Sequence, residues 1–320
     1  MTQFLKFIIY ISILVGCASC AFRSDKEYTS VPEKNSIYHW KTTFAPDSSA
    51  LGFLRKHDIG RLYIRMFDVS IKKNYAENKT DIVPVATTDF EVPVPDSIEV
   101  VPVTFITIEA LRQMRGEEAK YAELIVERLL AMCSYNKCGQ ISEIQFDCDW
   151  TSSTKDIYTK LCKTAKSLLE VKNIDLSITV RLHQLTESAP DVDRGVLMLY
   201  NTGAFKNFDT RNSILDIRDA KIYLKKLKYS IPLDYAYPVF GWGIKFRDEK
   251  FVSIVRESDI VTEENEYIRY ERPSVESILE VKKLVEQQLG KPYSGNILYH
   301  FDNKQLNNYT DNEIGQIIAY

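Results

Sequence analysis

Two acidic residues stand two positions apart near the middle of the chain, in a stretch whose polar and apolar residues alternate. Side chains alternate between the two faces of a β-strand, so Gln145, Asp147 and Asp149 share one face, while Ile144 and Phe146 share the other. Adjacent carboxylates on a buried strand repel each other and are unfavourable unless something binds or uses them. The pair therefore predicts a ligand site, with Asp149 and Asp147 as its candidate catalytic residues.

Apolar strand segments alternate with helical segments beyond residue 35, and no structureless linker divides them. Strands are predicted at 38–44, 61–69, 101–108, 143–149, 176–183, 196–201, 233–240 and 296–302. Helices are predicted at 117–132, 154–171, 214–226 and 274–289. This alternation predicts an α/β fold, a single (β/α)8 TIM barrel domain over 36–320.

Two intervals depart from the alternation and are expected to be insertions. The proline-rich interval 71–100, after the second strand, predicts extended segments or a hairpin. The interval 241–256 follows the seventh strand and has two apolar runs around a polar turn, which predicts a second hairpin. A hairpin there would project from the carboxyl end of the barrel, where insertions shape substrate sites.

The carboxyl ends of barrel strands carry the functional residues in this architecture. They supply these candidates for substrate binding: Trp40, Arg65, Glu109, Arg181, His183, Tyr237, Trp242, His300 and Asp302. Arg181 is also explained as a structural ion-pair partner of Asp147. His183 and His300 are also explained as core or rim residues. Tyr237 is also explained as a residue that fills the barrel interior, and Glu109 as the first residue of a loop.

The first 17 residues have the pattern of a targeting segment, with Lys6 before an apolar run. Leu14-Val15-Gly16-Cys17 resembles the lipobox of bacterial lipoproteins, which implies cleavage before Cys17 and lipidation of that residue. Residues 18–35 would then be a flexible tether, and the protein would be lipid-anchored in the cell envelope, on the outer membrane, periplasmic or surface side. Cys20 as the lipidated residue and an ordinary cleaved signal peptide are the alternatives.

Export implies an oxidising compartment, in which Cys133 and Cys138 can form a disulfide across a short polar loop. The balance of 41 Lys and Arg against 44 Asp and Glu, without a basic run, argues against nucleic acid as a partner. The chain has no Gly-rich phosphate loop, no Gly-x-Ser-x-Gly elbow and no His-Glu-x-x-His motif, so no cofactor is predicted. A metal held by Asp147, Asp149, His183 and His300 is an alternative that their spacing does not test, and no metal is assigned.

Asp147-Cys148-Asp149-Trp150-Thr151 resembles the Asp-x-Asp-x-Glu signature that closes the fourth strand in chitinase-like glycoside hydrolases. In that family the glutamate protonates the glycosidic oxygen, and the preceding aspartate orients the acetamido group that attacks the sugar carbon. Here Thr151 stands in place of the glutamate and Ile144 in place of the first aspartate of the motif. Threonine cannot act as a general acid near neutral pH. The resemblance thus implies the fold and carbohydrate binding, with a degenerate motif.

A second similarity, over 145–179 and 235–243, is to a family of exported bacterial barrel lipoproteins with no assigned activity. One hypothesis is a glycan-cleaving enzyme that uses Asp149 as the acid with an unassigned second carboxylate. The alternatives are a non-catalytic lipoprotein that binds a glycan or peptide, and a scaffold without a small ligand. The hairpin at 241–256 is the expected surface for any protein partner.

Overall fold

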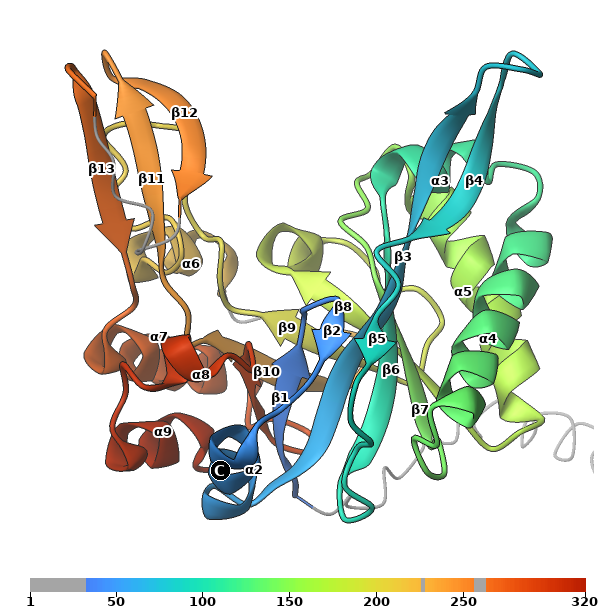
Figure 1. Cartoon of the computed structure of the whole chain (residues 1–320), viewed down its shortest axis with the longest axis horizontal. Coiled ribbons are helices and arrows are strands. Elements are labelled where there is room, and N and C mark those ends of the chain that lie inside the picture. Colours follow the sequence, from blue (N-terminus) through green and yellow to red (C-terminus); the bar gives the residue numbers. More distant parts are fainter. Residues whose placement is uncertain (1–32, 226–227, 256–262) are drawn as a thin grey trace, which may run out of the picture. The chain divides into compact units, whose positions relative to one another are not determined.

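A closed barrel of eight parallel strands forms the centre of the fold (Figure 1). The computed structural model describes residues 33–225, 228–255 and 263–320. The barrel closes because β1 pairs with both β3 and β14. In pairing order the strands are β1 (Asn35–His39), β3 (Ile59–Asn74), β6 (Glu99–Ile106), β7 (Glu143–Asp147), β8 (Asp175–Arg181), β9 (Arg194–Met198), β10 (Leu233–Pro238) and β14 (Asn296–Tyr299). The predicted (β/α)8 TIM barrel is confirmed.

Helices connect most of the barrel strands and cover the outside of the barrel. They are α2 (Ser48–Lys56), α3 (Ile108–Gln113), α4 (Glu118–Tyr135), α5 (Lys155–Glu170), α6 (Ile217–Tyr223), α7 (Val275–Leu289), α8 (Asn303–Leu306) and α9 (Asp311–Ile318), with a 3₁₀ helix, η1 (Leu182–Thr186), after β8. Each of the four predicted helices overlaps one of these, namely α4, α5, α6 and α7. In α5 the buried residues Ile157, Leu161, Ala165 and Leu169 recur every four positions, which gives the helix one apolar face for the barrel.

Both predicted insertions are present, and both leave the barrel at the carboxyl ends of its strands (Figure 1). After the second barrel strand, β3 runs on as a hairpin with β4 (Lys79–Val85), and β5 (Asp89–Phe90) pairs with β2 (Thr43–Phe44). After β10, the strands β11 (Trp242–Arg247) and β12 (Lys250–Val255) form the expected hairpin. A third strand, β13 (Glu266–Glu271), pairs with β11 and completes an antiparallel sheet.

Alternation along the strands separates two apolar layers. Residues that point outward pack against the helices in a large core that includes Ile144, Phe146 and Leu298. Residues that point inward form a smaller core that includes Tyr38, Tyr63, Val101 and Met198. Polar side chains occupy the rest of the interior, and their positions define the two ends of the barrel described below.

The two cysteines of the predicted disulfide are free thiols in the structure, so that pairing is not formed there. Cys133 and Cys138 nevertheless lie side by side at the end of α4, where the amide of Cys138 donates to the carbonyl of Cys133 at 2.9 Å. This backbone bond and the left-handed φ of 53° at Lys137 are typical of a Schellman helix end, which brings both residues together. Cys17 and the tether up to residue 32 lie outside the described residues.

Candidate functional site

The polar side chains of the neighbouring strands β7 and β8 contact each other on the inner wall of the barrel. Gln145 donates through Nε2 to Oγ of Ser177 at 3.2 Å. One level higher, the Thr179 hydroxyl donates to Oδ1 of Asp147 at 2.5 Å. Arg181 ends β8 and completes the series, so the shared face predicted for these residues exists.

Arg181 binds both candidate catalytic carboxylates. Its Nη2 lies 3.1 Å from Oδ1 of Asp147, and its Nε donates to Oδ1 of Asp149. The Asp147 side chain is 3% exposed and that of Asp149 is 50% exposed. Burial raises the pKa of Asp147, and the charge of Arg181 partly offsets that rise. The structural ion pair considered from the sequence is present, and it includes both acids.

The fourth barrel strand ends two residues earlier than predicted, at Asp147, so Asp149 lies in the loop that leads to α5. Trp150 in this loop is buried, with its ring 6.2 Å from that of Tyr158. Thr151 is exposed, and its hydroxyl lies 3.0 Å from the hydroxyl of Ser153. Thr151 therefore offers a short hydroxyl side chain that is bonded within its own loop.

A cluster of aromatic rings lies at the same end of the barrel, where Tyr200 and Tyr299 are within electrostatic reach of Asp147 and Arg181. The ring of Tyr299 lies 4.5 Å from that of Tyr200, 5.9 Å from that of Trp40 and 5.6 Å from that of Phe240. Trp242 of the inserted sheet continues the series, 5.6 Å from Phe240. Trp40 and Trp242, both predicted to bind substrate, are thus joined through two intermediate rings.

Arg65 reaches the same end of the barrel, 5.6 Å over the ring of Trp40. Its guanidinium makes two hydrogen bonds to the carboxylate of Asp68. Simple alternation would place Asp68, three positions after Arg65, on the opposite face of the strand. A bulge between Arg65 and Phe67, where β3 pairs with β6, reverses that parity and places both residues together.

Three of the predicted substrate-binding residues lie away from this cluster. Tyr237 was expected in the barrel interior, which is wrong, because Asp234 and Ala236 are the inward residues of β10. Tyr237 is fully buried in the outer core, and burial raises its pKa. Glu109 is an exposed residue in the first turn of α3. His183 is exposed on η1, because β8 ends at Arg181 rather than at His183 as predicted.

His300 and Asp302 follow the end of β14 and have structural contacts. Asp302 accepts a hydrogen bond from the amide of Lys304 at the start of α8 and lies 2.8 Å from Nζ of Lys41. Although burial raises the pKa of Asp302, Lys41 and this helix amide hold it below the ordinary value. Burial lowers the pKa of His300 to about 4, so its imidazole is neutral near neutral pH. Within the described residues, no group of three or more His, Cys, Asp and Glu side chains is arranged to hold a metal ion.

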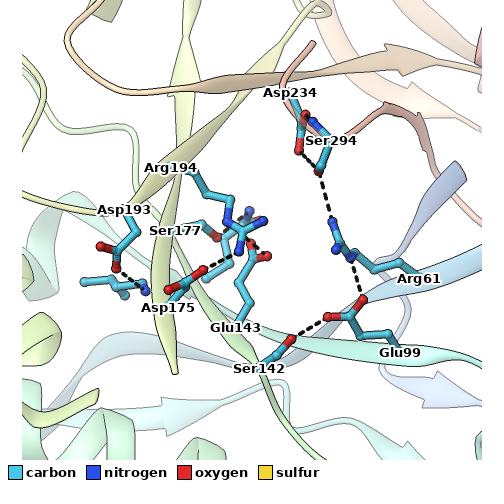
Figure 2. Close-up of polar contacts among 12 residues, drawn as sticks. Arg61, Glu99, Ser142, Glu143, Asp175, Ser177, Asp193, Arg194, Asp234 and Ser294 are labelled. Carbon is cyan, nitrogen blue, oxygen red and sulfur yellow. Dashed lines mark hydrogen bonds and ion pairs between the residues drawn. The ribbon is translucent and has the colours of Figure 1, made fainter. Parts of the chain in front are cut away.

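The opposite end of the barrel contains a buried charge network that the sequence reasoning missed (Figure 2). Charged residues stand within the first three positions of six barrel strands: Arg61, Glu99, Glu143, Asp175, Arg194 and Asp234. Arg61 donates to Glu99 at 3.0 Å and to Ser294 at 3.2 Å. Glu143 is fully buried, with Nε of Arg194 3.5 Å from Oε2. The sequence could have indicated this network, because charged residues stand near the start of successive apolar strands at positions that point into the barrel.

Solved structures similar to this chain include chitinases and a spore cortex-lytic enzyme. The chain matches no family model and no curated protein. It is similar to a chitinase from Chromobacterium violaceum, with a TM-score of 0.56, 11% identity and coverage of 90% of this chain and 99% of that one. The spore cortex-lytic enzyme SleL from Bacillus cereus gives 0.53 and 13%, covering 91% and 75%. A Group IV chitinase from Ostrinia furnacalis in complex with allosamidin gives 0.52 and 11%, covering 89% and 97%. At these identities the likeness establishes the fold alone: the chain has a chitinase-like barrel.

Proposed function

We propose that this barrel binds a glycan at the carboxyl end of its strands and does not cleave it by the mechanism of chitinase-like enzymes. The observation that carries the proposal is the Asp147–Arg181–Asp149 ion pair within electrostatic reach of Tyr299, whose ring packs against that of Trp40. Sugar rings stack on aromatic faces, and sugar hydroxyls form hydrogen bonds with charged polar groups. The similarity to chitinases and to a spore cortex-lytic enzyme supports a glycan as the ligand class.

Among the described residues, the four acids that lie with the ring cluster at this barrel end are each bound by a cation, which supports binding without cleavage. A general acid for glycoside hydrolysis must be protonated and must reach the glycosidic oxygen. Asp147 is buried under Arg181, and Asp149 is bound by the same guanidinium. Asp68 is bound by Arg65, and Asp302 by Lys41. Thr151 offers only a hydroxyl where the related enzymes have a glutamate.

Trp40→Ala is expected to weaken binding of chitohexaose roughly tenfold, because it removes an apolar ring next to Tyr299 and Arg65. Calorimetric titration measures the change. Tyr135→Ala removes an aromatic ring that is 87% exposed at the end of α4 and serves as the control with unchanged affinity. Equal affinities of the two variants would remove Trp40 from the site.

We further propose that the barrel is held at a membrane through a lipid on Cys17, as the lipobox resemblance implies. Cys17→Ser is expected to move the protein from the membrane fraction to the soluble fraction, because the lipid acceptor is lost. Cys20→Ser is the matched control and is expected to leave the protein with the membranes. Membrane fractionation followed by immunoblotting measures where each variant is found. If Cys20→Ser, rather than Cys17→Ser, releases the protein from the membranes, the lipid is on Cys20. In the described part of the chain no helix is long and apolar enough to span a membrane.

A further inference from the structure

An ion pair is buried in the inserted sheet, between Arg269 and Glu271 of β13. Nε of Arg269 donates to Oε1 of Glu271 at 2.7 Å, and the two side chains are 9% and 0% exposed. Buried ion pairs add little to stability compared with apolar side chains of the same size. What this pair does is therefore decided by its other contacts.

Glu271 holds parts of two other elements. Its Oε2 accepts hydrogen bonds from Nε1 of Trp242 at 3.0 Å and from the amide and hydroxyl of Ser213 at 2.8 and 2.5 Å. Trp242 begins β11, and Ser213 lies in the loop that follows β9. The carboxylate thus joins three segments of the chain at one buried point.

Arg269 binds the same loop through its backbone. Its guanidinium donates to the carbonyl oxygens of Phe205, Asn207 and Phe208 at 3.0, 2.8 and 2.7 Å. Three carbonyls on one cation, together with the two bonds from Ser213 to Glu271, fix the loop 205–213 against the inserted sheet. The loop and the sheet are therefore held as one unit.

Trp242 connects this unit to the candidate site. Its ring lies 5.6 Å from that of Phe240, which lies 5.6 Å from that of Tyr299. Because Glu271 accepts the only N–H of the indole, Trp242 can offer a ligand its ring but no hydrogen bond. The orientation of that ring is set by a carboxylate that the ligand does not touch.

We propose that Glu271 and Arg269 are positioning residues, which hold Trp242 and the loop 205–213 as one wall of the binding site for a sugar that stacks on the indole. This inference rests on the proposed glycan-binding function and assigns the inserted sheet a part in it. Specificity at this wall comes from the apolar face of a sugar ring rather than from hydrogen bonding to the indole.

Glu271→Gln tests the proposal, with Glu266→Gln as the matched control. Glu266 lies on the same strand, its side chain is 2% exposed, and it pairs with Lys245 and Arg247 rather than with Trp242. Glu271→Gln is expected to weaken chitohexaose binding about tenfold. It is also expected to shift the ¹⁹F resonance of fluorotryptophan at position 242 and to speed amide exchange in 205–213. Glu266→Gln is expected to leave the affinity, the ¹⁹F resonance and the amide exchange rate at their wild-type values.

Wild-type affinity, resonance and loop exchange in Glu271→Gln would overturn the proposal. If the wild-type protein does not bind chitohexaose, the proposed function fails, while the ¹⁹F and exchange comparison still decides whether Glu271 positions Trp242. If Glu271→Gln does not fold, Ser213→Ala removes a single donor to the same carboxylate. Faster loop exchange and a shifted resonance in that variant support the proposal, and unchanged values contradict it.

Discussion

Replacing Arg181 with methionine is expected to lower the free energy of unfolding by about 3–5 kcal/mol. Methionine fills much of the space of the arginine stem but leaves the carboxylate of Asp147, which is 3% exposed, without its cation. An unpaired buried charge is far more unfavourable than a lost surface contact. Urea denaturation near neutral pH measures the change.

A double variant and a surface control show whether the loss of stability comes from the unpaired carboxylate of Asp147. Asp147→Asn together with Arg181→Met is expected to regain most of the stability, because the buried carboxylate is gone as well. Arg218→Met, which breaks an exposed pair with Asp216, is expected to stay close to the wild-type protein. If Arg181→Met were as stable as Arg218→Met, the ion pair would not organise this end of the barrel.

The pH dependence of Arg181→Met follows from the pKa of Asp147. Burial raises that pKa in the folded protein, and loss of Arg181 raises it further. A group with a raised folded pKa favours folding below its ordinary pKa, and this advantage is lost as the pH rises through the folded value. The loss of unfolding free energy in Arg181→Met should therefore be smallest at acidic pH and should grow toward neutral pH.

Two glutamates at the opposite end of the barrel are expected to respond to neutralisation in opposite ways (Figure 2). Burial raises the pKa of Glu99, but Arg61, Lys34 and Ser142 outweigh it and hold the pKa at about 2. Compared with the ordinary value of 4.5, this corresponds to about 3 kcal/mol of stability at neutral pH. Glu99→Gln should lower the free energy of unfolding by that amount near neutral pH. As the pH falls toward 2, its stability should approach that of the wild-type protein.

Glu143 differs because burial raises its pKa more than Arg194 and Arg61 lower it. Its ion pair is long, because Nε of Arg194 lies 3.5 Å from Oε2. The surrounding network has Lys34, Arg61 and Arg194 against four carboxylates, those of Glu99, Glu143, Asp175 and Asp234. Glu143 is therefore the acid that gains most from losing its charge.

Glu143→Gln should accordingly be at least as stable as the wild-type protein at neutral pH. The wild-type protein loses stability as the pH rises above the ordinary glutamate pKa through the raised value, and the variant should lack that fall. Urea unfolding of the wild-type protein and both variants over a pH series provides the comparison. A loss in Glu143→Gln equal to that in Glu99→Gln would show that Glu143 is a paired, ionised group.

Alternation along single strands was enough to predict the barrel and the polar inward face of its fourth strand. The barrel, both insertions and the inward face of Gln145, Asp147 and Arg181 follow from local periodicity. The ends of strands were less accurate, because a strand stops where its neighbours stop pairing. That is why Asp149 and His183 lie in loops rather than on β7 and β8.

Contacts between distant segments could not be predicted from local pattern. The bulge that places Asp68 beside Arg65 depends on how β3 pairs with β6. Arg61 binds Glu99, 38 positions away, and Ser294, 233 positions away. Tyr237 is outward because β10 enters the barrel with Asp234 facing in, and nothing in its own alternation fixes that choice.

A saturation-transfer NMR experiment on chitohexaose in the presence of the full chain tests the central claim most directly. One series of spectra reports both contact with the protein, through transfer to sugar protons, and cleavage, through new reducing-end signals. Binding without cleavage predicts strong transfer and no new reducing-end signals over prolonged incubation. Growth of those signals would make the protein a hydrolase, and an absence of transfer would contradict glycan binding at this site.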